Sequence, residues 1–209
     1  MAGVRTAWRA IDDGEFFCTG CGGDRSYQLL AGRRRLTVLG VPVLPRGPAD
    51  PVVACASCHG HFPVVDLEQP TTTRLSALLR DAVHTIALAL LAGGGGDRIV
   101  ARRAAVASVR ETGFADCTEE RLLTLQAALW AGGRPALDRE AREVLVALAP
   151  HLALPGRHSL LLHGARIALA DGAYRPSERE ILGAIGVSLR LQPAETDRLL
   201  TEAAAASGA

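Results

Sequence analysis

Four of the five cysteines occur in two C-x-x-C pairs, Cys18 with Cys21 and Cys55 with Cys58. Two intervening residues allow both thiolates of a pair to face one cation, and two such pairs supply the four ligands of a tetrahedral structural zinc site. Two alternatives remain open, namely four buried free thiols and a site in which His59 or His61 replaces Cys58. A closed four-thiolate site stabilises its fold and leaves no coordination position for catalysis, so we expect structural Zn²⁺.

The stretch ALADGAYRPSERE, residues 168–180, contains a second candidate site. Ser177 and Glu180 have the spacing of a capping box at the start of a helix, which accounts for most of its polar residues. Asp171 is not explained in this way, because a carboxylate beside the negative end of the preceding helix is unfavourable. Carboxylates are good ligands of Ca²⁺ and Mg²⁺. Asp171 and Glu178 are therefore candidate ligands of a divalent cation, against the alternative that the turn only joins two helices.

Three consecutive arginines, Arg33, Arg34 and Arg35, form a third candidate site. We expect them near the tip of a β-hairpin, where they would meet the phosphate groups of a nucleic acid. Arginines in a turn also occur as a solvated edge that discourages strand pairing. The net charge of +1 and the aromatic content of 4% favour this second interpretation. Nucleic-acid binding through these arginines is therefore the alternative function.

The other reactive side chains do not form a catalytic pattern. Asp81 and His84 share one helical face, a spacing that is typical of a surface contact. Cys117 is flanked by acidic residues, which raise the pKa of a thiol and oppose a role as nucleophile. No Ser-His-Asp order, H-E-x-x-H motif, P-loop or G-x-G-x-x-G motif occurs in the chain. The sequence therefore predicts a protein that is not an enzyme.

The cysteine pairs lie in a segment that has the pattern of short strands. Residues 27–30 and 35–44 are apolar or rich in β-branched side chains. Four prolines between residues 42 and 51 exclude a long helix. We therefore expect residues 1–68 to form an N-terminal segment and a small β zinc ribbon, with the ribbon in residues 16–67.

From residue 71 onward the apolar residues recur with a helical period of about 3.6. The letters RLLT at residues 121–124 recur at residues 198–201, which favours an internal duplication of a helix–loop–helix–helix unit. We expect an all-helical domain of seven helices over residues 71–205. The first helix ends at the glycine run 93–96, and the others span 99–111, 116–131, 135–149, 156–170, 177–189 and 193–205.

The pattern A-L-A-D-G-x-x-x-x-x-E, which ends at Glu178 and continues with Arg-Glu-Ile-Leu, resembles the TerB-like domain of tellurite-resistance proteins. The resemblance is strongest over residues 160–200 and extends more weakly back to residue 73. A similar fold occurs in the N-terminal region of DnaJ-like membrane co-chaperones, and a zinc ribbon before a TerB-like domain resembles a known bacterial architecture. The resemblance implies an all-helical, internally duplicated fold, a metal-binding acidic surface with Asp171 and Glu178, and a place in stress-response complexes near the inner membrane.

The first copy of the repeat departs from the family pattern. Where Asp-Gly and a following Glu are expected, the chain has the glycine run 93–96, and Arg98, Arg102 and Arg103 follow it. If metal binding needs both copies, this chain has lost it. The three arginines would then pair with the two acids of the second copy instead.

The sequence as a whole predicts a mainly α protein, with an all-helical TerB-like domain of about seven helices preceded by a small β zinc ribbon. By resemblance we expect a non-enzymatic accessory or scaffold protein of tellurite or metal stress, which binds protein partners, including those of a membrane-associated stress complex. The longest apolar run, residues 86–96, is too short to span a bilayer, and the N-terminus has no apolar leader, so a cytoplasmic location is expected. The alternative is a zinc-ribbon adaptor that binds nucleic acid through the three arginines.

Overall fold

The computed structural model describes residues 2–38, 41–95, 99–130 and 133–207. The contacts between residues divide the chain into two compact units, Met1–Leu75 and Ser76–Ala209. The first unit contains a β-sheet and the cysteine pairs. The second unit is built from helices, and α1 (Thr72–Leu90) begins at the end of the first unit and continues into the second.

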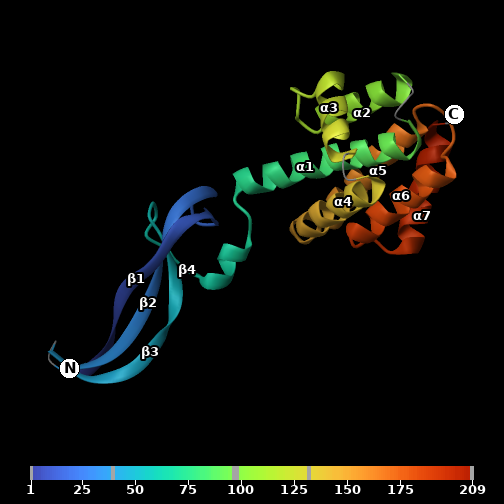
Figure 1. Cartoon of the computed structure of the whole chain (residues 1–209). Helices are drawn as coiled ribbons and strands as arrows, with labels where there is room; N and C mark the ends of the chain where they lie inside the picture. Colours follow the sequence, from blue (N-terminus) through green and yellow to red (C-terminus); the bar gives the residue numbers. More distant parts are fainter. Residues whose placement is uncertain (1, 39–40, 96–98, 131–132, 208–209) are drawn as a thin grey trace. The chain divides into compact units, whose positions relative to one another are not determined.

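The sheet of the first unit is antiparallel and follows the order of the sequence (Figure 1). Its strands are β1 (Ala2–Cys18), β2 (Gly23–Val38), β3 (Val41–Cys55) and β4 (His61–Pro63). The register places Cys18 opposite Gly23 and Cys55 opposite Tyr27, so β1 and β3 each end, at the same end of the sheet, at the first cysteine of a pair. β4 pairs with β3 only at residues 52–54, and a short 3₁₀ helix, Val64–Glu68, follows it.

The protein is mostly helical, but the prediction of only a small β ribbon before the helices is wrong, because the sheet is much larger than expected. β1, β2 and β3 contain 17, 16 and 15 residues, and the sheet begins at Ala2 and not near residue 16. Residues 2–15 find their partners in β2, a pairing between distant segments that a local pattern does not reveal. The prolines of β3 are tolerated because most of this strand has a free edge and its register against β2 shifts three times.

The helical unit contains the rest of α1 and six further α-helices among the described residues (Figure 1). A five-residue π-helical segment, Leu91–Gly95, follows α1, and a 3₁₀ turn, Ala149–His151, follows α4. The further helices are α2 (Ile99–Glu111), α3 (Glu119–Trp130), α4 (Arg134–Leu148), α5 (Leu154–Leu169), α6 (Pro176–Ser188) and α7 (Pro193–Ser207).

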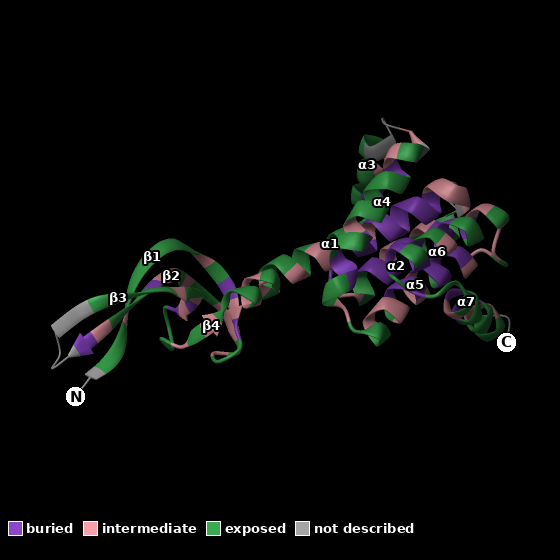
Figure 2. Cartoon of the chain, turned by 90° about the horizontal axis from the view of Figure 1, so that it is seen from below, coloured by how far each residue is buried: buried purple, intermediate pink, exposed green. Residues whose placement is uncertain are grey.

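The core of the helical unit is formed by aliphatic side chains on the inner faces of the helices, drawn in purple in Figure 2. Ile86 of α1, Leu161 of α5 and Leu182 of α6 each expose at most 1% of their surface. The helices approach closely at Gly164 of α5, where an added Cβ would lie 3.0 Å from Leu182 Cδ2 and 3.1 Å from Ile86 Cγ2. The apolar residues that recur with the helical period in the sequence therefore pack together in one shared core.

The segment Val64–Gly94 contains an 18-residue window with a mean hydropathy of 1.5, so by length and composition it is apolar enough to cross a membrane. Half of that window is buried inside the protein. Within α1, every residue from Ala82 to Leu90 except His84 is buried. The core helix of a soluble protein passes the same test, so the packing of α1 is sufficient to account for its hydropathy.

Candidate metal centre

The two cysteine pairs lie on turns that share one backbone geometry. In the first turn the Gly22 N–H donates to the Cys18 carbonyl oxygen at 2.9 Å, and in the second the His59 N–H donates to the Cys55 carbonyl oxygen at 3.0 Å. Gly22 and His59 both have positive φ, at 67° and 57°. Each turn thus closes through a left-handed residue four positions after its first cysteine, and both thiols of the pair are directed to the same side.

The four cysteine sulfurs form one cluster. All four Sγ atoms lie within 4.8 Å of one another, and no histidine or carboxylate belongs to this group among the described residues. Two of the separations are 3.8 Å, between Cys18 and Cys58, and 3.9 Å, between Cys21 and Cys55. A tetrahedron of sulfurs about 2.3 Å from a central cation has edges of about 3.8 Å. The cysteines therefore form a candidate metal-binding site, as their spacing predicts.

The alternatives with a histidine ligand are not supported by the positions of the two rings. His59 and His61 are both outside the group of clustered ligand atoms. The His61 ring makes an edge contact with Trp8 instead, with ring centroids 5.7 Å apart. A disulfide within the cluster is also absent, because all five cysteines are free and a disulfide needs a sulfur separation of about 2.05 Å.

The thiols of the cluster differ in acidity. Burial, together with hydrogen bonds to the other three thiols, raises the pKa of Cys21 to about 12. Burial also acts to raise the pKa of Cys55. Hydrogen bonds outweigh it, from the backbone N–H groups of Cys58 and Ser57 and from neighbouring thiols, and they lower the pKa of Cys55 to about 6. The Ser57 N–H lies 3.4 Å from Cys55 Sγ. Because the thiolate is the form that binds metal, Cys55 is prepared as a ligand at neutral pH.

Aromatic rings pack around the cluster and hold the turns in place. Phe16 is 1% exposed, and its ring lies 5.6 Å from the rings of both Tyr27 and Phe62. A Cβ added at Gly60 would lie 3.1 Å from the Phe62 ring and 3.3 Å from Cys58 Sγ, so a side chain here would push the ring or the sulfur aside. The sulfur cluster is therefore built into the only apolar core of the first unit that the described residues show.

The acidic turn between α5 and α6 brings Asp171 and Glu178 to one arginine that the sequence did not single out. Arg175 NH2 lies 3.0 Å from Asp171 Oδ2, and Arg175 NH1 lies 4.0 Å from Glu178 Oε1. The side chains of Asp171 and Glu178 are only 6% and 2% exposed. A guanidinium thus lies between the two candidate ligands, and the divalent-cation site at these acids stays a prediction.

The predicted capping box at Ser177 and Glu180 is wrong. α6 begins with Pro176 in its first turn, so Arg175 is the N-cap residue and Glu178 takes the N3 position. Glu178 Oε2 accepts a hydrogen bond of 2.9 Å from the Arg175 backbone N–H. Pro176 was the signal for this, because proline is favoured at the first helical position and fixes the cap one residue before it.

The glycine run after α1 packs directly against this turn. Ser177 Oγ donates a hydrogen bond of 2.7 Å to the Gly93 carbonyl oxygen. A Cβ added at Gly93 would collide with Ile181 Cδ1, and one added at Gly94 would lie 3.1 Å from Arg175 NH1. Gly93 and Gly94 are therefore explained by close approach of the backbone to Arg175 and α6.

The arginines of the first repeat were expected as alternative partners of the two acids. Arg102 instead pairs with Glu119, with Nε 2.7 Å from Oε1. Arg103 is exposed on α2. Arg98 lies outside the described residues. Asp171 and Glu178 interact with Arg175, which lies between them in the same turn.

The three consecutive arginines lie in a strand, toward the end of β2 that pairs with the start of β3. Arg33, Arg34 and Arg35 belong to the second half of β2, and all three are exposed. A hollow of about 550 Å³ beside them is lined on its other side by Leu44, Pro45, Gly47 and Pro48 of β3. The arginines are therefore displayed on a rigid strand.

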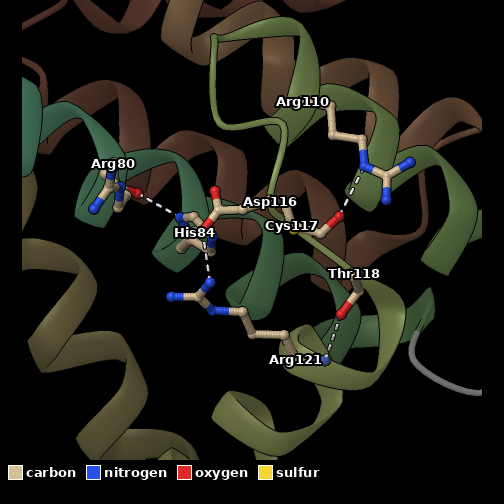
Figure 3. Close-up of polar contacts among 7 residues, drawn as sticks. All are labelled: Arg80, His84, Arg110, Asp116, Cys117, Thr118 and Arg121. Carbon is tan, nitrogen blue, oxygen red and sulfur yellow. Dashed lines mark hydrogen bonds and ion pairs between the residues drawn. The ribbon is translucent and has the colours of Figure 1, made fainter.

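The discarded catalytic candidates lie near one another in the helical unit (Figure 3). His84 Nδ1 lies 2.7 Å from the Arg80 carbonyl oxygen, so this nitrogen donates to the backbone. Cys117 is 1% exposed, and its pKa is raised by burial and by Asp116, although Arg110 acts in the opposite direction. A buried, protonated thiol is a poor nucleophile.

The chain matches no protein-family model, no curated protein and no solved structure, so its function has to be inferred from its own residues and their geometry.

Proposed function

We propose that the chain is a non-enzymatic accessory protein whose N-terminal ribbon is stabilised by one structural Zn²⁺ ion. The observation that carries this proposal is the four-sulfur cluster, in which the Cys18–Cys58 and Cys21–Cys55 sulfur separations of 3.8 and 3.9 Å match the edges of a tetrahedral zinc–thiolate site. Four thiolates complete the coordination that zinc prefers and leave no position for water or substrate. The ion therefore serves the fold of the ribbon.

Metal analysis of the purified protein tests this proposal. We expect about one Zn²⁺ per chain, retained during dialysis, and a large loss of zinc in Cys18→Ser and Cys55→Ser. Cys117→Ser is the matched control, because Cys117 is a buried cysteine of the helical unit and does not belong to the cluster. This variant should retain one Zn²⁺ per chain. Absence of metal from the wild type, or iron with visible absorbance, would contradict the assignment of zinc.

The wider role is proposed from the resemblance of residues 160–200 to the TerB-like domain. We infer a scaffold that binds protein partners, including those of a membrane-associated complex, in the cytoplasmic response to tellurite or other metal stress. Support comes from the Asp-Gly and Glu pattern of residues 168–178. Deletion of the gene should increase sensitivity to tellurite, and a chain with Cys18→Ser should fail to restore resistance. Unchanged resistance in the deletion strain would contradict this role.

The divalent-cation site at Asp171 and Glu178 also rests on the resemblance. A Ca²⁺ or Mg²⁺ ion would have to displace the Arg175 guanidinium from the two carboxylates, so we expect weak binding. Titration calorimetry of the wild type and Asp171→Asn with each cation checks the site. Binding that Asp171→Asn abolishes would support it, and flat curves for both proteins would mean that the turn is purely structural.

A further inference from the structure

Positive charge is concentrated at the end of the sheet that is remote from the cysteines. Residues 1–11 and 27–49 contain six arginines and no aspartate or glutamate. All six are exposed, and within the described residues none of them forms an ion pair with a carboxylate. These residues are Arg5, Arg9, Arg33, Arg34, Arg35 and Arg46. The chain contains no lysine, so the choice of arginine carries no information, but the separation from acidic residues does.

The strand register gathers four of these arginines on one side of the sheet. Arg5 is opposite Arg35, and Arg9 is opposite Ala31, two positions from Arg33. Opposite residues of an antiparallel pair point to the same side, and so do alternate residues of one strand. The set formed by Arg5, Arg9, Arg33 and Arg35 is called the arginine face.

At the cysteine end of the sheet, one side of β2 covers the apolar core. The arginine face lies on that same side of β2, farther along the strand. Tyr27 and Leu29 pack on that core, and two-residue steps along β2 lead from them to Arg33 and Arg35. The strands of the described part of the unit all belong to one sheet, so no second layer of strands covers this side farther along. Like charges directly opposite each other, as at Arg5 and Arg35, destabilise a sheet. A bound polyanion would remove that repulsion.

We infer that the arginine face binds the phosphate backbone of a nucleic acid duplex without reading its sequence. Arginines two residues apart on a strand are about 7 Å apart, and each guanidinium donates two parallel hydrogen bonds to a phosphate. The hollow beside Arg33 and Arg35 gives a phosphate room to approach from the β3 side.

The side chains around the arginine face distinguish a duplex from other polyanions. Proteins that bind single strands provide aromatic rings for stacking, but Trp8 is opposite Gly32 and therefore lies on the other side of the sheet. Val4 of β1, which is 52% exposed, is on that other side as well. A membrane surface that took up these apolar side chains would leave the arginines directed away from the lipid.

Fluorescence anisotropy with a labelled 20-base-pair DNA duplex of arbitrary sequence tests the inference on the full zinc-loaded chain. We expect the association constant to fall about 100-fold between 50 and 200 mM salt, because four phosphate contacts give a log–log slope of about −3.6. The variant with Arg5→Gln, Arg33→Gln and Arg35→Gln should lose most of this binding, with a slope near −1.

The control variant changes three exposed arginines of the helical unit, with Arg103→Gln, Arg139→Gln and Arg142→Gln, and has the same net charge of −2. It should bind the duplex within threefold of the wild type. Zinc content and thermal unfolding verify that both variants are folded. Three results would overturn the inference: no duplex binding by the wild type at 50 mM salt, equal losses in the two variants, or tighter binding to a single strand or to phosphatidylserine vesicles than to the duplex.

Discussion

Arg175 illustrates how one side chain determines the character of a candidate site. The sequence presents Asp171 and Glu178 as two acids at the spacing of a known pattern, which suggests a cation. The structure supplies that cation from the protein itself, since the Arg175 guanidinium lies 3.0 Å from Asp171 Oδ2 and 4.0 Å from Glu178 Oε1. The Arg175 backbone N–H also donates a hydrogen bond to Glu178 Oε2. Two carboxylates that are almost completely buried are stable only when a positive charge or hydrogen bonds compensate them.

Removal of this guanidinium should destabilise the helical unit. Arg175→Ala leaves the side chains of Asp171 and Glu178, which are 6% and 2% exposed, without their shared positive charge. We expect the free energy of unfolding to fall by about 2–4 kcal/mol, measured by urea denaturation followed by circular dichroism. Arg179→Ala is the matched control: this arginine is 50% exposed and lies 3.6 Å from Asp197, so its removal should cost less than about 1 kcal/mol. Equal losses would contradict a special role for Arg175.

His163 makes the stability of the helical unit depend on pH. Its Nδ1 accepts a hydrogen bond of 2.6 Å from Arg166 and lies 3.2 Å from Ser108 Oγ, so the ring is neutral in the folded state. Burial and the Arg166 charge lower the pKa of His163 below 6.5, although Glu111 acts in the opposite direction. The unfolded chain therefore binds more protons just below pH 6.5, and the stabilisation present above that pH is lost as the pH falls through the lowered pKa.

Thermal unfolding between pH 7.5 and 5.0 measures this effect. We expect the midpoint of the wild type to fall over this range, and the difference between the wild type and His163→Gln to shrink as the pH decreases. A constant difference at all pH values would contradict the assignment of the pH dependence to this histidine.

At the scale of the elements, the two cysteine turns differ in one strained position. Gly22 and His59 occupy equivalent left-handed positions, but only glycine adopts that conformation without steric cost. We expect His59→Gly to raise the stability of the zinc-loaded ribbon by about 1 kcal/mol. Gly22→Ala should lower it by a similar amount. Zinc affinity measured by competition with a chelator should follow the same order, and an unchanged affinity in both variants would contradict this account.

The helices were more accessible to sequence reasoning than the strands. Helical periodicity is a local property, so residues 99–111 and 193–205 predict α2 and most of α7 closely. The partners of β1 lie up to 36 residues away along the chain, as in the pair Ala2 and Val38, and no short window contains both. The polar composition of residues 2–15 therefore concealed a long strand.

The candidate sites also differ in whether their residues are close together or far apart in the sequence. The C-x-x-C spacing is local and was sufficient to predict the sulfur cluster. The arginine face was not predictable in this way, because Arg5 and Arg9 join Arg33 and Arg35 only through the register of two strands. Arg175 was missed although its signal is local, since Pro176 marks the residue before it as the helix cap.

At the scale of the whole molecule, the two units have separate cores and should respond differently to loss of metal. Treatment with a strong chelator should unfold the ribbon, because its small core is built around the four thiols. The helical unit should keep its structure, since its core contains none of the clustered cysteines. Circular dichroism at 222 nm should therefore change little, whereas proteolysis should become rapid within residues 1–68. A cooperative loss of the helical signal would contradict independent stability.

The alternation of side chains along β2 limits how the ribbon can change in length during evolution or engineering. Tyr27 and Leu29 are in phase with Arg33 and Arg35, so the metal end determines to which side the arginines point. Removal of two residues from each long strand between these positions would shorten the ribbon by about 7 Å and keep the arginines on the same side. Removal of one residue would turn them to the side of Trp8. Functional variants of this ribbon should therefore differ in strand length by even numbers of residues.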